Sequence, residues 1–395
     1  GTFNEGIDQV NVDADNFTHF RRKSNDNSLK SNKILTIYED KKEIIWIGTD
    51  GGGLNQYNPA TGVFKQLLNQ PGNTATISGN HVLSVCEMEN GELWVGTWGA
   101  GITVLNSNRK VIRHFQHNSL INTSLSGNNI WKIFQDSDNN IWIGTYGGGL
   151  NLYNPNNHTF TRYPYGLNSA KGTNNSKILS IYEDSSGFLW IGTDGSGLNK
   201  MDRKNKSFEY FLNSQGKNSI SDNTVGVVKE DKYGNFWIAT KKGLDYFNSK
   251  NRKFTHYSET DGLGGDIIHG ILDDSKGNLW ISTNKGISNF DLTSKSFRNF
   301  SEADGLQFGE FKELASLKTK SGKMYFGGNN GINAFWPERI KPVKFDPPVY
   351  ITGFQIFNKN INVAKDEKDL SPLKENILLT NEITLSYKNS VFSFD

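Results

Sequence analysis

Seven residues occupy the same place in a recurring strand motif, yet their side chains differ from copy to copy. Each comes directly after Trp-Ile-Gly-Thr or a variant of it: Asp50, Trp98, Tyr146, Asp194, Lys241, Asn284 and Asn329. Aromatic faces stack on sugar rings, and charged and amide groups bond to sugar hydroxyls. These residue types therefore predict a ligand-binding ring at the mouth of a central channel. Trp98 and Tyr146 would flank one sugar there.

Asp194 or Asp50 would accept hydrogen bonds from the hydroxyls of that sugar. The alternative interpretation is that the Asp and Asn residues only form turns and the aromatic residues are ordinary surface residues. Lys241 and Lys242 suit a sulfate or carboxylate of the ligand, or else form a solvated pair of charges.

Signatures of catalysis and metal binding are absent from the sequence. The seven histidines lack metal-ligand spacing, no Gly-x-Ser-x-Gly elbow occurs, and the glycine triplets lack the context of a phosphate-binding loop. Adjacent carboxylates such as Asp273 and Asp274 stand before turns, where acidic residues are common. We therefore expect no catalytic residue, metal or cofactor. His81 and His269, near the starts of inner strands, keep a propeller-fold lyase or hydrolase open as an alternative.

The motif that carries the seven residues recurs with a nearly constant period. Each copy has an apolar run, a polar turn, the motif strand, a glycine-rich turn and two more short strands, such as residues 150–153 and 160–163. Four antiparallel strands in about 45 residues form one blade of a β-propeller. The lead aromatic residues are 43 to 48 positions apart, and Tyr325 leads the weaker seventh copy. The six tryptophans among them should pack between blades: Trp46, Trp94, Trp142, Trp190, Trp237 and Trp280.

The number of copies predicts an all-β, seven-bladed propeller of four-stranded antiparallel blades. Six copies are complete, and the seventh, residues 313–336, has three strands. Residues 17–20 resemble an outer strand, so we expect them to complete the seventh blade and close the ring. Closure leaves only short, protected strand edges.

Three segments follow from the pattern along the chain. Residues 1–12 resemble the tail of a preceding repeat, residues 13–340 are the propeller, and residues 341–395 are a proline-bearing linker followed by the first strands of an incomplete β-sandwich. The expected strands of that last segment are residues 349–357, 361–363, 383–387 and 391–394.

Composition excludes several classes of protein. A net charge of +2 argues against a dedicated nucleic-acid surface. Cys86 is the only cysteine, so no intrachain disulfide is possible, and its apolar surroundings indicate a core position. No stretch is long and apolar enough to span a membrane.

The repeats resemble a known family. The recurring Trp-Ile-Gly-Thr-Asp-Gly-Gly-Gly-Leu-Asn, with Tyr-Asn-Pro and Phe-x-x-Tyr, is similar to the two-component-regulator propeller repeat. That repeat builds the periplasmic sensor of hybrid two-component systems in glycan-degrading gut bacteria. The segment from Pro348 to Phe354, with Leu385 to Ser390, resembles the start of the immunoglobulin-like (Ig-like) domain that follows two seven-bladed propellers in that family.

The resemblance implies a function and partners. It implies a periplasmic module of an inner-membrane-anchored protein that detects an oligosaccharide or polysaccharide fragment and signals to a membrane-bound histidine kinase. It further implies contacts with a preceding propeller and an Ig-like domain, a homodimer, and no nucleic acid bound by this part. The kinase has no counterpart in this sequence, so the chain itself is expected not to be an enzyme. A scaffold that binds protein is the remaining alternative.

Overall fold

The computed structural model describes residues 16–24, 27–166, 171–214, 218–340, 351–366 and 369–394. Two compact units divide the chain, Gly1–Ile340 and Lys341–Asp395. The predicted tail of a preceding repeat, residues 1–12, lies outside the described residues, as does most of the predicted linker. Within the described part of the chain, no helix has the length and apolar character needed to cross a membrane.

The first unit is built from seven four-stranded antiparallel blades, which we call blades 1 to 7, and the inner strands of blades 7 and 1 are joined by one parallel pair, Leu314 and Thr36. Blade 1 is β2 (Ile34–Glu39), β3 (Ile45–Thr49), β4 (Leu54–Asn58) and β5 (Val63–Leu67). Blade 2 is β6 (Val82–Glu87), β7 (Leu93–Thr97), β8 (Gly101–Leu105) and β9 (Val111–Phe115). Blade 3 is β10 (Ile130–Gln135), β11 (Ile141–Thr145), β12 (Gly149–Asn154) and β13 (Thr159–Arg162).

The remaining blades follow the same order. Blade 4 is β14 (Ile178–Glu183), β15 (Leu189–Thr193), β16 (Leu198–Asp202) and β17 (Ser207–Phe211). Blade 5 is β18 (Val225–Glu230), β19 (Phe236–Thr240), β20 (Gly243–Asn248) and β21 (Lys253–Tyr257). Blade 6 is β22 (Ile268–Asp273), β23 (Leu279–Thr283), β24 (Gly286–Asp291) and β25 (Ser296–Phe300). Blade 7 is β26 (Phe311–Lys318), β27 (Met324–Gly328), β28 (Gly331–Phe335) and β1 (Thr18–Phe20). Short 3-10 turns are η2 (Glu259–Asp261), η3 (Glu302–Asp304) and η4 (Pro337–Arg339).

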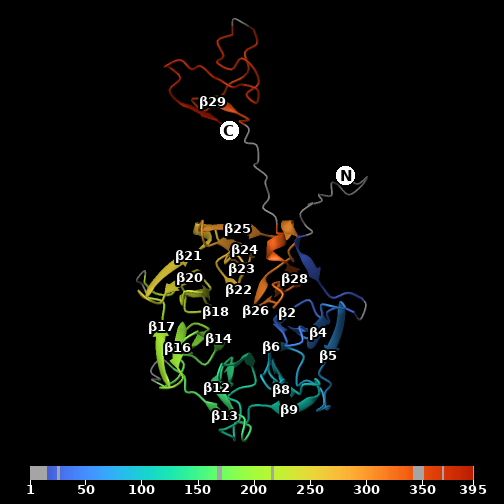
Figure 1. Cartoon of the computed structure of the whole chain (residues 1–395). Helices are drawn as coiled ribbons and strands as arrows, with labels where there is room; N and C mark the ends of the chain where they lie inside the picture. The colour runs from blue at the N-terminus through green and yellow to red at the C-terminus, as the bar shows by residue number, and fades with distance from the viewer. Residues whose placement is uncertain are drawn as a thin grey trace. The chain divides into compact units, whose positions relative to one another are not determined.

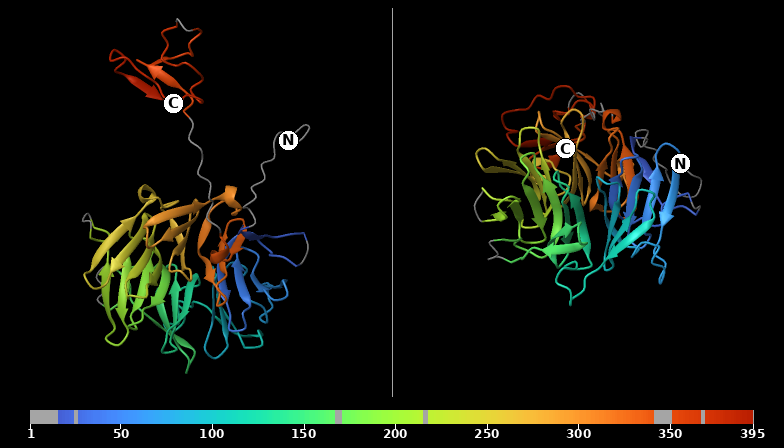
Figure 2. Two further views of the ribbon diagram at one scale, coloured as in Figure 1. Left: turned by 45° about the horizontal axis from the view of Figure 1, so that its top comes forward. Right: turned by 60° about the horizontal axis from the view of Figure 1, so that its bottom comes forward.

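The blades are arranged around a central axis, with the first strand of each blade on the inside and the fourth on the outside (Figure 1). Figure 2 shows the same ring from two further directions, with the N-terminal β1 beside the last blade. β1 pairs antiparallel with β28, with His19 opposite Asn333. The closure predicted from residues 17–20 is therefore confirmed, and blade 7 is assembled from both ends of the unit.

The lead aromatic residue of each motif packs against the next blade, as predicted. Trp46 of blade 1 lies in one apolar cluster with Val82 and Leu93 of blade 2, and Tyr325 of blade 7 lies in another with Ile34 of blade 1. The indole N–H of Trp46 donates to Asp40 Oδ2 at 2.8 Å. The indole N–H groups of Trp142 and Trp190 are satisfied in the same way, by Asp136 and Asp184 of their own blades, whereas that of Trp237 is buried without a hydrogen-bond partner among the described residues. The buried rings therefore join neighbouring sheets through apolar packing.

The second unit contains a three-stranded sheet. Its strands are β29 (Phe354–Ile356), β30 (Lys359–Asn360) and β31 (Phe392–Phe394). Residues 361–363 and 383–387, which the alternating pattern predicted as strands, are not strands, so that part of the prediction is wrong. A strand needs a neighbouring strand and a covered apolar face, whereas Val363 and Tyr387 in these two segments are exposed. An Ig-like sandwich for this unit remains a prediction.

Candidate functional site

The backbone places the predicted ring residues at equivalent points of the blades. Each stands where the second strand ends, beside the residue that precedes the first strand of the same blade. The backbone N–H of Asp50 donates to the carbonyl of Lys33 at 2.9 Å, and that of Tyr146 donates to the carbonyl of Asn129 at 2.9 Å. The same bond holds Trp98, Asp194, Asn284 and Asn329. Repeated backbone geometry thus brings chemically different side chains to one end of the first and second strands.

Three aromatic rings from blades 2 and 3 pack together at this end. The ring centroids of Trp98 and Tyr146 are 5.7 Å apart, and those of Tyr146 and Trp131 are 5.3 Å apart. Rings that flank a sugar need a separation of about 7–8 Å, twice a carbon–carbon contact distance. The expectation that Trp98 and Tyr146 flank one sugar is therefore wrong for this arrangement. The indole of Trp98, 44% exposed, instead offers the open aromatic surface.

Polar contacts extend this cluster into blades 4 and 5. The hydroxyl of Tyr146 donates to Asp194 Oδ2 at 2.7 Å, and the ammonium groups of Lys177 and Lys241 each lie 3.7 Å from a carboxylate oxygen of Asp194. Lys177 Nζ also lies 5.1 Å from the centroid of the Tyr146 ring. Three predicted residues from three consecutive blades thus form one network.

Charges shift the pKa values of two members of the network. Burial alone would raise the pKa of Asp194, but the hydrogen bond from Tyr146 and the charges of Lys241 and Lys177 hold that pKa below its usual range. The hydrogen bond to Asp194, together with burial, raises the pKa of Tyr146. The carboxylate is therefore ionised and the phenol neutral at pH 7, so the network has both acceptors and donors to offer.

Asp50 belongs to blade 1 and lies at the same end of the strands as the aromatic cluster and the Asp194 network. Its carboxylate Oδ1 is 2.5 Å from His81 Nδ1 of blade 2, and its Oδ2 is 3.8 Å from Lys33 Nζ. The carbonyl of His81 accepts the backbone N–H of Trp98, so Asp50 is continuous with the aromatic cluster. We call the connected set the arc: Asp50, His81, Trp98, Trp131, Tyr146, Lys177, Asp194 and Lys241.

Two predicted residues, Asn284 and Asn329, are not joined to the arc by a side-chain contact within the described ranges. The side-chain oxygen of Asn284 is buried without a hydrogen-bond partner among those residues. The pattern therefore identified five members of the arc and two residues outside it. Three further residues complete the arc: His81, Trp131 and Lys177. Each lies just before or at the start of the first strand of its blade. Whether such a residue contacts the arc depends on the direction of its side chain.

A further variable position of the repeat was not recognised as a set from the sequence, although one member, His269, was named there as a possible catalytic residue. In blades 1 to 6 the second residue of the first strand is bulged: Ile34 pairs with Thr49 and Thr36 with Gly48, which leaves Leu35 unpaired. The bulged residues of the six blades are Leu35, Leu83, Trp131, Leu179, Gly226 and His269. Aligning the repeats would have revealed this signal, because the position is leucine in three copies and differs in three.

His269 is the unusual member of that set. Its side chain is 7% exposed, and neither ring nitrogen has a hydrogen-bond partner in the described part of the chain. Burial, with the nearby charges of Lys312 and Lys241, lowers the pKa of His269 to about 4. Burial likewise raises the pKa of Glu313 on the neighbouring blade. No hydrogen bond or ion pair joins His269 to Glu313 in the described part of the chain.

Metal binding has no support in the described side chains. No group of three or more His, Cys, Asp or Glu residues among them is arranged to hold a metal ion. Cys86 is half-buried, packs beside the core of blades 2 and 3, and has a pKa raised to about 11 by burial. Its thiol therefore stays protonated and unreactive at neutral pH.

The sequence model of the family described as two component regulator propeller matches four segments of the chain, residues 28–51, 124–147, 172–195 and 262–285. Each segment contains the first two strands of a blade and ends just after one of the predicted ring residues. The chain thus carries repeats of this family in blades 1, 3, 4 and 6.

One curated relative is a protein of Formosa agariphila named histidine kinase P4. It is 27% identical over 176 residues, which cover 45% of this chain and 10% of the relative. Among solved structures, the extracellular domain of a hybrid two-component system from B. thetaiotaomicron has a TM-score of 0.67 at 22% identity and covers 86% of this chain. The match covers 45% of that domain, so this chain spans less than half of its length.

Two further solved structures share the fold. PorZ, a surface component of the type-IX secretion system of Porphyromonas gingivalis, has a TM-score of 0.60 at 16% identity over 80% of this chain and 48% of its own. A catalytically inactive variant of virginiamycin B lyase from Staphylococcus aureus has a TM-score of 0.59 at 11% identity over 80% of this chain and 98% of its own. The same propeller fold is therefore found in proteins of different functions.

Proposed function

We propose that this chain is the extracytoplasmic sensing part of a hybrid two-component regulator. In this role the propeller detects an oligosaccharide, and the second unit relays binding toward a membrane-bound histidine kinase. Support comes from the family repeats in four blades, from the histidine kinase among its relatives and from the fold shared with an extracellular domain of such a system. A periplasmic location, an adjoining propeller and a homodimer belong to the same proposal.

The arc is the observation that carries the ligand class. It combines an exposed indole with an ionised carboxylate, a phenol and two ammonium groups across five neighbouring blades. Such a surface offers an apolar face for a sugar ring beside donors and acceptors for its hydroxyls. The arc lies at positions that vary between otherwise similar repeats, as expected where the scaffold is constant and the ligand contacts are specific.

Binding should depend on the indole of Trp98. A glycan array identifies a ligand, and calorimetry then measures its affinity for the parent, for Trp98→Ala and for a control, Tyr233→Ala, which removes an exposed aromatic outside the arc. Loss of a stacked ring should weaken binding by about 1–3 kcal/mol in Trp98→Ala alone. Equal affinity of all three proteins would place the site elsewhere.

A propeller-fold lyase or hydrolase is the alternative, favoured by the neutral, unpartnered imidazole of His269. Incubation with the glycans that bind separates the two proposals. Saturable binding with no new product supports a sensor, whereas product formation that is lost in His269→Gln supports an enzyme. If the protein neither binds nor converts any glycan, the remaining interpretation is a scaffold that binds protein.

A further inference from the structure

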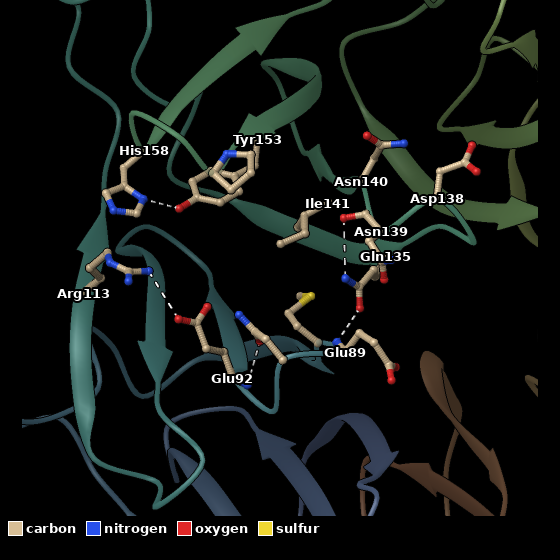
Figure 3. A pocket seen from close by; sticks show the side chains of 13 residues that line it. Glu89, Glu92, Arg113, Gln135, Asp138, Asn139, Asn140, Ile141, Tyr153 and His158 are labelled. Carbon is tan, nitrogen blue, oxygen red and sulfur yellow. Dashed lines mark hydrogen bonds and ion pairs between the residues drawn. The ribbon is translucent and has the colours of Figure 1, made fainter.

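One open space in the packing of the propeller lies between blades 2 and 3. At the interfaces on either side an arginine fills the equivalent space, Arg109 between blades 1 and 2 and Arg203 between blades 3 and 4. A cavity of about 740 Å³ is found here instead, and Figure 3 shows the side chains that line it. Three exceptions to the repeat account for the difference: Met88 in place of Asp40, Gln135 in place of Glu87 and Pro155 in place of Arg203.

The charged side chains of this cavity already have partners. Each carboxylate that lines it is paired with a cation: Glu89 with Lys41 at 2.8 Å, Glu92 with Arg113 at 3.5 Å and Asp138 with Arg203 at 3.1 Å. Its apolar residues Met88 and Tyr153 are buried against the core of blades 2 and 3. The cavity therefore offers neither an unpaired carboxylate nor a free apolar face to a ligand.

A second open space lies at the axis of the propeller, in a layer formed by the bulged residues of the first strands. Leu83 and Leu179 are buried, yet neither belongs to the seven apolar clusters of the described residues, which join neighbouring blades. Because the first strands surround the axis (Figure 1), these leucines face the axis itself. We call the six bulged residues the axial layer: Leu35, Leu83, Trp131, Leu179, Gly226 and His269.

The axial layer is apolar at blades 1 to 4 and open at blade 5. Gly226 stands where blades 1, 2 and 4 have a leucine. A Cβ placed on Gly226 would have no atom within 4 Å apart from those of its chain neighbours, and the φ of Gly226 lies outside the left-handed region. Neither a neighbouring atom nor the backbone therefore excludes a leucine at this position. The glycine leaves the volume of a leucine side chain unfilled.

His269 is the next member of the axial layer after Gly226. Its imidazole is buried, and neither ring nitrogen has a hydrogen-bond partner among the described residues. Burial, with the charges of Lys241 of blade 5 and Lys312 of blade 7, lowers its pKa to about 4, so at pH 7 the ring is neutral and has one donor and one acceptor. Buried polar groups are normally hydrogen-bonded, so these nitrogens point to a ligand group that bonds to them.

The surroundings of His269 favour a neutral ligand group over an ion. The ammonium of Lys241 lies 3.7 Å from a carboxylate oxygen of Asp194, and that of Lys312 lies 3.8 Å from one of Glu310. Both cations near the imidazole are thus already paired. Burial raises the pKa of Glu313, which favours the uncharged form of that carboxyl group. A group that carries both a donor and an acceptor but no charge is therefore the best match.

Given the glycan-sensing function proposed above, we propose that the open space at Gly226 receives the N-acetyl group of an amino sugar in the glycan that binds the arc. An acetamido group has the same number of non-hydrogen atoms as a leucine side chain and is branched like it. Its methyl group packs toward Leu179 of blade 4, and its amide bonds to His269 of blade 6. One ligand reaches both places, because Trp131 belongs to the arc and to the axial layer.

Matched pairs of glycans test this proposal. N-acetyllactosamine and lactose differ only in an acetamido group against a hydroxyl, as do N,N′-diacetylchitobiose and cellobiose at both of their sugars. On a glycan array that contains such pairs, the parent protein should bind only glycans with an N-acetylated sugar. In calorimetry the partner with the hydroxyl should bind at least about tenfold more weakly, since it lacks the amide that bonds to His269.

A variant that fills the space completes the test. Gly226→Leu installs the residue of blades 1, 2 and 4, so it should keep the melting temperature of the parent and lose the preference for the acetamido group. Ala60→Leu, which adds the same side chain at an exposed turn of blade 1, should keep that preference. If Gly226→Leu does not fold, His269→Leu provides the same comparison, because it removes the bond to the amide.

The outcomes separate this proposal from the sensing function on which it rests. A parent protein that binds no glycan overturns both proposals. Equal affinity for the two members of a pair, or a folded Gly226→Leu that keeps the preference, overturns the assignment of the space at Gly226 alone. In that case Trp98→Ala still tests whether the arc binds the glycan.

Discussion

Removal of Arg203 should destabilise the propeller far more than removal of an exposed arginine. The Arg203 side chain is 13% exposed, and its partner Asp136 is fully buried. Breaking a buried ion pair costs about 3–5 kcal/mol, because one charge remains buried without its partner. Asp136 keeps hydrogen bonds from the indole of Trp142 and the backbone N–H of Asn140, both at 2.8 Å. We therefore expect Arg203→Met to lower the free energy of unfolding by about 3 kcal/mol, the lower end of that range.

Urea denaturation monitored by tryptophan fluorescence measures the effect, with Arg252→Met as the matched control. Arg252 pairs with Glu209 on the surface, so its loss should cost less than about 1 kcal/mol. Equal losses of unfolding free energy in the two variants would refute the conclusion that the buried guanidinium of Arg203 stabilises the contact between blades 3 and 4.

The difference between parent and Arg203→Met should also depend on pH. Burial alone would raise the pKa of Asp136, but hydrogen bonds from Trp142, Asn140 and Arg203 hold it below its usual value. A carboxylate with a lowered pKa contributes stability above its unfolded pKa of about 3.9, and that contribution is lost as pH falls through the folded pKa. The stability difference should therefore be constant at neutral pH and shrink below about pH 4.

Three further predictions concern the ring and its core. Deleting residues 1–22 removes β1 from blade 7, so the melting temperature should fall or the protein should aggregate; an unchanged melting curve would contradict closure by this strand. Trp46→Ala should cost about 3–5 kcal/mol in urea denaturation, because the indole fills the space between blades 1 and 2, whereas Tyr233→Ala should change stability by less than about 0.5 kcal/mol. The pKa of His269 is lowered from 6.5 to about 4, so between these pH values the unfolded chain takes up a proton that the folded chain does not. Acidification should then cost up to about 3 kcal/mol, and a stability–pH profile of His269→Phe that kept this slope would show that another group is responsible.

The sequence alone predicted the fold because its signals are local and repeated. A strand needs only a few β-forming residues and a turn needs glycine or asparagine, so each blade is specified within about 45 residues. Closure by residues 17–20 could also be inferred, since the seventh copy lacked one strand. The prediction was less successful in residues 351–394, which have no repeat to compare and few partners for their apolar residues.

The sequence also identified five members of the arc, because positions that vary in a constant repeat can be found by alignment. It did not predict which side chains meet. Trp98 and Tyr146 stand 48 residues apart, and only the tertiary structure shows that their rings are in contact instead of flanking a ligand. Contacts between blades depend on side-chain rotamers and on which neighbours fill the space, and neither is encoded in a local pattern.

The interface between blades 2 and 3 illustrates the same division. Met88, Gln135 and Pro155 are visible in the sequence as exceptions to the repeat, but an exception has no meaning until its partners in space are known. Folding places the end of one blade's strand beside the turn of the previous blade, so residues about 46 to 69 positions apart form one site. The chain's own pattern thus determines seven blades, and the packing between blades determines where a space is filled by an arginine and where it stays open.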